Sequence, residues 1–312
     1  MHLAIYLLIG LILLTVFSGF YVFWVACARR KEIPWLEEAI KQTPYGKYYD
    51  AIQASACFLR EQQAQDVWVQ SHDGLKLHAH WIPAKNAVGT ILLAHGYRST
   101  KLVDFSMVYR MYLDWGLNLL VPDQRSHGQS QGRFITFGVK ESRDMKCWIR
   151  WLNQNNPEQP IMLSGLSMGA STMLYLADQQ LPPNVKGIIA DCGFSSPWEI
   201  LSSVFRKVTH LPAGLSIWVA NLFANVLAGF DLRERDTRKI LPHSRIPVLM
   251  VHGTADDFVP CAMTKEAFQV CAEPKELLLV EGAGHGVSFL VDPDRYMKVV
   301  KEFFFTCMGV RL

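Results

Sequence analysis

The chain carries a serine, a histidine and two aspartates inside short motifs rich in glycine. Ser167 lies in the sequence GLSMG, His285 lies in EGAGHG, and Asp256 and Asp257 stand together in HGTADDFVP. A serine hydroxyl is a weak nucleophile near neutral pH and needs a base, which a neutral imidazole can supply. The imidazole in turn needs a carboxylate that fixes its tautomer. These residue types therefore predict a Ser-His-Asp triad that contains one of the two aspartates.

The surroundings of Ser167 decide between a nucleophile and an ordinary turn serine, because the G-x-S-x-G pattern also arises by chance. The apolar residues 161–163 predict a strand, and a helix is expected to begin near Met168. In this strand–turn–helix context, a sharp turn projects a nucleophilic serine from the sheet. Gly165 and Gly169 leave space for the neighbouring backbone, and the helix N-terminus directs free N–H groups at an oxyanion. The context favours the nucleophile.

A second loop can complete an oxyanion hole. The sequence LAHGY, which ends at Tyr97, follows the apolar run 89–94, and Gly96 allows a tight turn there. We expect the backbone N–H groups of Tyr97 and Met168 to bind the oxyanion. Loss of one such donor typically lowers the rate by about 10²–10³.

Strands and helices alternate along the chain from about residue 66. A D-G turn predicts a hairpin between 67–69 and 75–82. Short apolar runs, typical of buried parallel strands, are 89–94, 117–121, 161–163, 185–190, 247–251 and 276–280. Helices are expected at 103–115, 139–152, 168–181, 263–271 and 293–307. This alternation predicts an α/β fold with a mostly parallel sheet and helices on both faces, and reactive groups gather beyond the carboxyl ends of such strands.

The N-terminal segment differs in kind from the rest. The run from Leu3 to Ala28 contains no charged residue, and about 20 apolar residues cross the roughly 30 Å of a bilayer core. The length of the run and the cluster Arg29-Arg30-Lys31 after it argue against a cleaved signal peptide. A buried core helix is the other alternative. We expect residues 1–30 to be a single transmembrane anchor, and the positive-inside rule places the catalytic domain in the cytoplasm.

Residues 31–65 are expected to be a helical linker. Its aromatic side chains recur at helical spacing. This aromatic stripe either lies on the membrane surface or packs into the core, and the sequence favours neither alternative.

The strand–helix alternation is interrupted between residues 190 and 247. Residues 195–207 have a helical pattern, and 211–230 carry no charge. A second membrane span is one interpretation of 211–230, but its proline, glycines and asparagines argue against that. We favour an apolar helical cap at about 195–243, inserted in a hydrolase domain of residues 66–312 and covering a pocket.

Composition excludes several function classes. The 31 basic and 28 acidic residues give a net charge of +3, which is too small to indicate a nucleic-acid-binding surface. The seven scattered cysteines contain no C-x-x-C pair and argue against a disulfide framework or a zinc site. His78 and His80 alternate along a strand, but we expect no Asp, Glu or Cys to complete a ligand set with them, and therefore no metal. No dinucleotide or phosphate loop is present, so no cofactor is expected.

In its motifs, the chain from about residue 66 to the end resembles the α/β-hydrolase superfamily. HGYRS resembles the oxyanion loop of that family, DQRSHGQS its D-x-R-G-H-G-x-S loop, GLSMG its nucleophile elbow, HGTADDFVP its acid loop and GAGHG its histidine loop. In the resemblance, the acid matches Asp256 rather than Asp257. Ser126 stands where the family usually has glycine, in a loop that serves as scaffolding. The chain looks most like small bacterial hydrolases with a membrane anchor and a helical cap, similar to acylaminoacyl peptidases, lysophospholipases or monoacylglycerol lipases.

The resemblance and the triad together imply a serine hydrolase that cleaves carboxylic esters through an acyl-enzyme. The anchor and the apolar segment favour a lipophilic acyl ester as substrate. An aminoacyl peptidase or a thioesterase would use the same triad. A non-catalytic hydrolase-like binding protein is an alternative of another class, although no member of the triad is missing from the sequence.

Overall fold

The apolar runs of the sequence form a sheet of eight strands within the residues that the structure describes, which are 2–30, 41, 46–157 and 159–309. The strands are β1 (Gln65–Gln70), β2 (Lys76–Ile82), β3 (Gly89–Ala94), β4 (Leu117–Pro122), β5 (Ile161–Leu166), β6 (Val185–Asp191), β7 (Val248–Gly253) and β8 (Lys275–Val280). In this computed structural model their order is β1-β2-β4-β3-β5-β6-β7-β8. β2 pairs antiparallel with β1 and β4, and all the other neighbours are parallel. The expected hairpin and the mostly parallel sheet are both confirmed.

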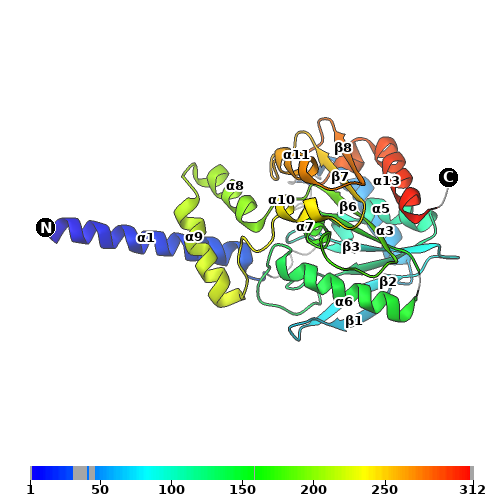
Figure 1. The fold of residues 1–312 in the computed structure, drawn as a ribbon, viewed down its shortest axis with the longest axis horizontal. Coiled ribbons are helices and arrows are strands. Elements are labelled where there is room, and N and C mark those ends of the chain that lie inside the picture. The colour runs from blue at the N-terminus through cyan, green and yellow to red at the C-terminus, as the bar shows by residue number, and fades with distance from the viewer. Residues whose placement is uncertain (1, 31–40, 42–45, 158, 310–312) are drawn as a thin grey trace.

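Helices cover both faces of the sheet (Figure 1). On one face lie α6 (Val139–Asn155), α7 (Met168–Leu174), α10 (Thr237–Ile240) and α11 (Cys261–Val270). On the other face lie α3 (Tyr49–Glu61), α5 (Ser106–Asp114), α12 (Ser288–Val291) and α13 (Pro293–Met308). Every residue of β3, β4, β5 and β7 is buried, as expected for central strands that are covered on both faces. Short helical turns complete the chain at η1 (Gly46–Tyr48), α4 (Lys101–Asp104) and η3 (Leu241–His243).

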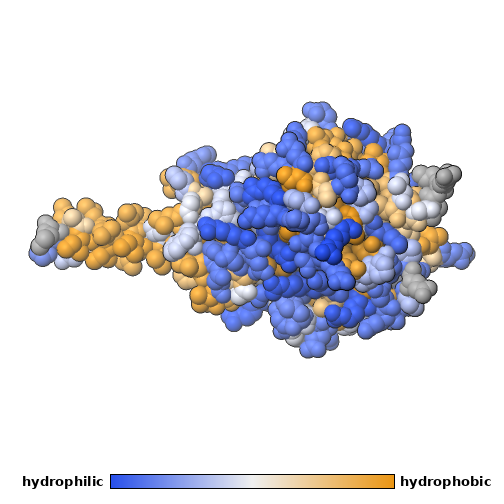
Figure 2. Space-filling view, in the orientation of Figure 1, coloured by the Kyte–Doolittle hydropathy of each residue, from blue (hydrophilic) through white to orange (hydrophobic). Residues whose placement is uncertain are grey.

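A long N-terminal helix, α1 (His2–Cys27), projects from this body and crosses α9 (Gly214–Phe223) near its inner end (Figure 1). A third buried cluster joins Phe23 and Cys27 of α1 to Ile217 of α9 and Ile200 of α8 (Pro197–Thr209). The outer part of α1 is exposed and consists mainly of apolar residues, as the visible face shows (Figure 2). By length and composition, α1 can cross a membrane.

Three expected helices differ from the structure. The helix expected at 103–115 is divided at Phe105 into α4 and α5. The helix expected at 168–181 ends at Leu174, and the amides of Leu176, Ala177 and Gln179 bond three residues back in tight turns. The apolar segment 211–230 forms the ten residues of α9 and the five of η2 (Ala224–Ala228). Together they extend about 22 Å, which is short of a bilayer core of about 30 Å.

Of the aromatic stripe predicted for the linker, Trp35 and Tyr45 lie outside the described residues, whereas Tyr48 and Tyr49 lie within them. Of residues 31–65, the structure describes 41 and 46 onward. Ile52, Ala56 and Leu59 of α3 are buried, and α3 packs on α5. For α3, the structure therefore favours core packing over the membrane surface.

Candidate active site

Ser167 occupies a strained turn between β5 and α7. Its φ is 54° and its ψ is −115°, a combination that residues with a side chain rarely adopt. Two backbone hydrogen bonds hold the turn: Ser167 N–H donates to Asp191 O at 2.8 Å, and Ser167 O accepts from Ser171 N–H at 3.1 Å. Such strain persists only where the surrounding structure fixes the backbone.

The glycines of GLSMG are required by close backbone contacts. A Cβ on Gly169 would overlap the carbonyl groups of Ala94 and His95, and a Cβ on Gly165 would overlap the carbonyl of Gly169. These neighbours are backbone atoms and cannot rotate away. The two glycines therefore allow α7 to start directly against the end of β3.

The structure brings Ser167, His285 and Asp256 together. Ser167 Oγ lies 2.9 Å from His285 Nε2, and His285 Nδ1 lies 2.7 Å from Asp256 Oδ2. Ser167 is 5% exposed, the His285 side chain 16% and the Asp256 side chain 0%. All three follow carboxyl ends of strands: β5, β8 and β7, respectively. The catalytic roles of these residues stay a prediction, which their geometry makes chemically possible.

The two adjacent aspartates lie in opposite surroundings. Asp256 Oδ1 accepts from the N–H groups of Phe258 and Val259, both at 2.9 Å, and Oδ2 lies 3.1 Å from His252 Nε2. Burial alone would raise the pKa of Asp256, but the hydrogen bonds and charges of His252 and His285 hold it well below its usual value. Asp257, by contrast, is 79% exposed in its side chain and pairs with Lys207 at 3.2 Å.

The loop after β3 runs beside Ser167. A Cβ on Gly96 would lie 3.4 Å from Ser167 Cβ, so the loop backbone reaches the nucleophile. Gly96 N–H donates to Asp104 Oδ2 at 2.5 Å. Within the described part of the chain, the amides of Tyr97 and Met168 donate to no other protein group. Both are therefore free to serve as the expected oxyanion donors, and that role remains a prediction.

The end of α1 is bonded to this same loop. Tyr97 Oη donates to Ala26 O at 2.7 Å, and Arg98 Nη2 donates to Val25 O at 2.5 Å. Helix ends leave carbonyl groups without intrahelical partners, and these side chains bind two of them. The carboxyl end of α1 is thus tied to the segment that carries the Tyr97 amide.

His127 ties the loop after β4 to the loop after β3. His127 Nε2 accepts from Arg98 N–H at 3.1 Å, and its Nδ1 lies 3.0 Å from Arg125 O. Burial and the neighbouring His95 lower the pKa of His127 to about 3, so the ring is neutral.

In the same loop, Ser126 has a φ of 66°, which explains why the family usually has glycine there. The Ser126 hydroxyl donates to Phe134 O at 2.8 Å and anchors the turn.

The expectation that no acidic residue reaches His78 and His80 is wrong. Asp66 Oδ1 lies 2.8 Å from His78 Nε2 and 3.3 Å from His80 Nε2. The antiparallel register pairs Asp66 with His80, which places the three side chains on one face of the hairpin. His78 Nδ1 also lies 2.6 Å from Asp123, so the buried ring is bound on both sides by carboxylates. Strand register, which the sequence alone does not fix, is the reason for the error.

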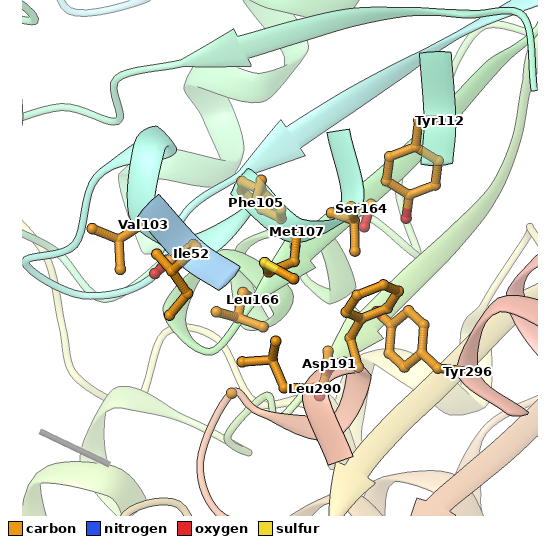
Figure 3. A pocket seen from close by; sticks show the side chains of 15 residues that line it. Ile52, Val103, Phe105, Met107, Tyr112, Ser164, Leu166, Asp191, Leu290 and Tyr296 are labelled. Atoms are coloured by element: carbon orange, nitrogen blue, oxygen red, sulfur yellow. The ribbon is translucent and has the colours of Figure 1, made fainter. Parts of the chain in front are cut away.

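An apolar pocket lies beside the nucleophile, on the face of the sheet covered by α3 and α5 (Figure 3). Leu166, which precedes Ser167, and Gly286, which follows His285, are part of its wall. Its free volume is only about 30 Å³ in this structure, within a larger space of about 530 Å³ that includes open solvent. The other apolar wall residues are Ile52, Val103, Phe105, Met107, Val108, Phe289 and Leu290.

Two carboxylates that the sequence motifs do not single out also line this pocket. Asp104 binds Gly96 N–H and Ser99 Oγ, and burial still raises its pKa. Asp191 accepts from Ser288 Oγ at 3.2 Å, and burial raises its pKa to about 6. Asp191 directly follows the predicted strand 185–190, and this position at the carboxyl end of a strand could have identified it as a residue near the site. No motif marks Asp104.

Comparisons with known proteins agree with this geometry. Residues 73–226, just under half of the chain, match the family model described as X-Pro dipeptidyl-peptidase (S15 family). The uncharacterized protein YqkD of Bacillus subtilis is 29% identical over 236 residues, which are 75% of this chain and 77% of that protein. The lysophosphatidylserine lipase ABHD12 of Danio rerio is 25% identical over 64% of this chain and 50% of its own length. The solved structure of the Pyrococcus furiosus esterase Pf2001 has a TM-score of 0.63 and 26% identity, and the match covers 78% of this chain and 90% of that one. These likenesses confirm the predicted fold and place the chain among esterase-like and peptidase-like hydrolases.

Proposed function

Because the chain belongs to the α/β-hydrolase superfamily, we propose that it is a membrane-anchored serine hydrolase that cleaves lipophilic carboxylic esters. One observation carries the proposal: a hydrogen-bonded series runs from Ser167 Oγ through His285 to the buried Asp256. The strained backbone of Ser167 supports it, because such strain often gathers at functional sites.

The geometry supports a two-step acyl transfer. Ser167 Oγ attacks the ester carbonyl carbon while His285 Nε2 takes the hydroxyl proton. The amides of Tyr97 and Met168 bind the negative oxygen of the tetrahedral intermediate. His285 then gives its proton to the leaving alcohol, and the acyl group remains on Ser167. Water, deprotonated by His285, attacks this acyl-enzyme. His285 then returns the proton to Ser167 Oγ as the bond to the acyl carbon breaks and the acid leaves. Throughout both steps Asp256 holds His285 in the tautomer that presents Nε2 to the serine.

The apolar pocket supports a lipophilic acyl group. Its wall begins at Leu166, one residue before the nucleophile, and continues over Ile52, Met107 and Leu290 (Figure 3). A hydrocarbon chain in this pocket would remove apolar surface from water, which contributes about 0.8 kcal/mol for each CH₂ group.

We propose that α1 is the membrane anchor. Its 26 residues contain no charge, and Arg29 and Arg30 follow directly, both exposed. Positive residues that flank a span are typical of its cytoplasmic side. The catalytic domain would then lie in the cytoplasm at the membrane.

A peptidase is the second candidate, with a specific observation in its favour. Residues 73–226 match the X-Pro dipeptidyl-peptidase model, and two carboxylates, Asp104 and Asp191, line the pocket. A carboxylate can bind the free amino group of a peptide. Both carboxylates already accept hydrogen bonds within the protein, and for this reason we place the ester first.

The test of the activated serine is labelling of the detergent-solubilised full chain with a fluorophosphonate probe. We expect labelling of the wild type and its loss in Ser167→Ala, whereas Ser203→Ala, on α8, should label like the wild type. A well-folded wild-type protein that does not label would contradict the proposal and support the non-catalytic binding protein.

Substrate class is tested with p-nitrophenyl esters from acetyl to dodecanoyl, beside aminoacyl and X-Pro p-nitroanilides and an acyl thioester. We expect kcat/KM to rise with acyl length and to exceed that for the amides and the thioester. Met107→Trp should fill the pocket and abolish the preference for long chains. Val270→Trp, at an exposed position of α11, should leave the preference unchanged. A preference for acetyl esters or for the amides would contradict the lipophilic ester.

A further inference from the structure

The outward side of the α9–η2 segment is a second apolar surface beside α1. Its side chains Leu215, Trp218, Leu222 and Val226 are between 45% and 81% exposed. They recur every three or four residues and therefore lie along one side of a helix. No charged residue occurs between 211 and 230. A soluble protein rarely exposes such a stripe without a partner.

The polar side chains of this segment are bonded to the protein instead. The amide groups of Asn221 and Asn225 donate to Asp231 at 2.9 and 3.2 Å. The hydroxyl of Ser216 lies 3.0 Å from that of Ser18 on α1. These amide NH2 groups and this hydroxyl thus have partners within the protein, which a hydrocarbon environment requires of polar groups.

The segment contacts α1 at positions that precede Arg29, the first charged residue after the helix, in the sequence. Ser18 contacts Ser216, and the rings of Phe20 and Phe23 pack on Phe223. These α1 residues precede Arg29 by 6 to 11 positions, which is about 9–16 Å along a helix that rises 1.5 Å per residue. A helix that lies in the membrane interface buries its apolar face about 5–10 Å deep. The crossing of α1 and α9 therefore lies at the deep end of this range or beyond it.

From this placement we infer that the exposed face of α9 and η2 lies in the lipid bilayer, in the same leaflet as the inner half of α1. The inference rests on the proposed membrane anchor and goes beyond it, because it places the cap itself in the membrane. Lipid is the occupant that the structure favours, since the apolar face continues directly into the exposed surface of α1 (Figure 2). Arg29 and Arg30 are exposed and follow the inner end of α1, where anionic headgroups would meet them if α1 spans the bilayer.

The membrane-facing segment is packed against the site. The buried cluster beneath α9 includes Met168, which follows the nucleophile, and Val259 of the acid loop. If α9 lies in the bilayer, the loops that hold the triad lie close to the membrane surface.

The test uses the full chain in lipid nanodiscs that contain zwitterionic and anionic lipids. Cys57, which is exposed, is replaced by serine, and single cysteines are introduced for an NBD fluorophore. Val226→Cys and Leu222→Cys report on the proposed face. Leu14→Cys on α1, where Leu14 is 65% exposed, is the positive control. Asp114→Cys on α5, with a side chain 70% exposed, is the aqueous control. The labelled Cys57→Ser parent gives the background.

We expect the labels at 14, 222 and 226 to show blue-shifted emission and quenching by doxyl lipids, and the label at 114 to show neither. If position 14 is quenched while 222 and 226 behave like 114, the anchor stands and this inference is overturned. If position 14 is not quenched either, the anchor itself fails. Blue-shifted emission at 222 and 226 that doxyl lipids do not quench, and that depends on the number of chains per disc, would assign the face to a second copy and overturn the inference.

Discussion

At the scale of single residues, the surroundings of Asp256 and Asp257 separate two side chains of identical chemistry. Asp256 is fully enclosed and lies 2.7 Å from His285, whereas Asp257 points to solvent beside Lys207. The pair gives a test in which the same substitution is made at adjacent positions.

We expect Asp256→Asn to lower kcat by about 10⁴, because the amide no longer fixes the imidazole tautomer that the reaction needs. Asp257→Asn should retain nearly all activity. Steady-state hydrolysis of the best ester from the chain-length series measures both. Equal effects of the two substitutions would contradict the assignment of Asp256.

Buried Asp191 predicts a pH dependence of stability. Burial raises its pKa in the folded protein to about 6, whereas an unfolded aspartate titrates near about 3.9. Between these values the unfolded chain has released its proton and the folded protein has not. The contribution of Asp191 to the free energy of unfolding therefore falls as pH rises from about 4 to 6, and stays low above that.

The side chain introduced by Asp191→Asn cannot ionise, so the variant should not lose stability as the pH rises through this range. We expect the variant to match the wild type near pH 4 and to be more stable at pH 7, by about 3 kcal/mol for a shift of two pKa units. Urea unfolding in detergent at several pH values measures the difference, with Asp114→Asn as an exposed control. A variant that is destabilised equally at pH 4 and pH 7 would show that Asp191 acts through its hydrogen bonds and not through its charge.

At the scale of elements, the contact between α7 and the end of β3 depends on a missing side chain. Gly169 approaches the carbonyl groups of Ala94 and His95 so closely that any Cβ would overlap them. Helix and strand must move apart if this space is filled, and the turn that holds Ser167 moves with them.

Gly169→Ala is therefore expected to destabilise the fold by about 3 kcal/mol or more and to abolish fluorophosphonate labelling. Gly214→Ala is the matched control, since nothing lies within 4 Å of the position that its Cβ would take. It should be neutral or stabilise α9 by up to about 1 kcal/mol. Thermal unfolding and labelling of both variants measure the effects. Normal labelling of a stable Gly169→Ala protein would show that the turn at Ser167 accommodates a side chain for which the structure has no room.

At the scale of the whole molecule, α1 is part of the folded body as well as a candidate anchor. Phe23 and Cys27 are each 1% exposed in the buried cluster under the cap. Ala26 and Val25 accept hydrogen bonds from Tyr97 and Arg98 of the oxyanion loop. The inner turns of α1 thus connect the cap to the site.

Deletion of residues 1–30 should therefore lower stability and labelling, beyond any loss of membrane attachment. Deletion of residues 2–14, which are exposed, should leave both near the wild type in detergent, because the buried residues of α1 remain. Thermal unfolding and labelling rates of the two deletions test this expectation. If the longer deletion behaves like the full chain, the inner turns of α1 contribute nothing to the fold or the site.

The sequence by itself determined the elements and the chemistry. Apolar runs predict the parallel strands, and local spacing around Ser167 predicts a tight turn, because these features depend on neighbours along the chain. The motifs also named Ser167, Asp256 and His285, which the structure brings within hydrogen-bonding distance.

Only the tertiary structure decided what depends on long-range contacts. Strand register placed Asp66 beside His78 and His80, against expectation. Packing across the sheet placed Asp104 and Asp191 at the pocket. The crossing of α1 and α9 joined two apolar segments about 200 positions apart in the chain. Burial and pairing at such separations follow from how the layers pack together, and no local pattern in the sequence encodes them.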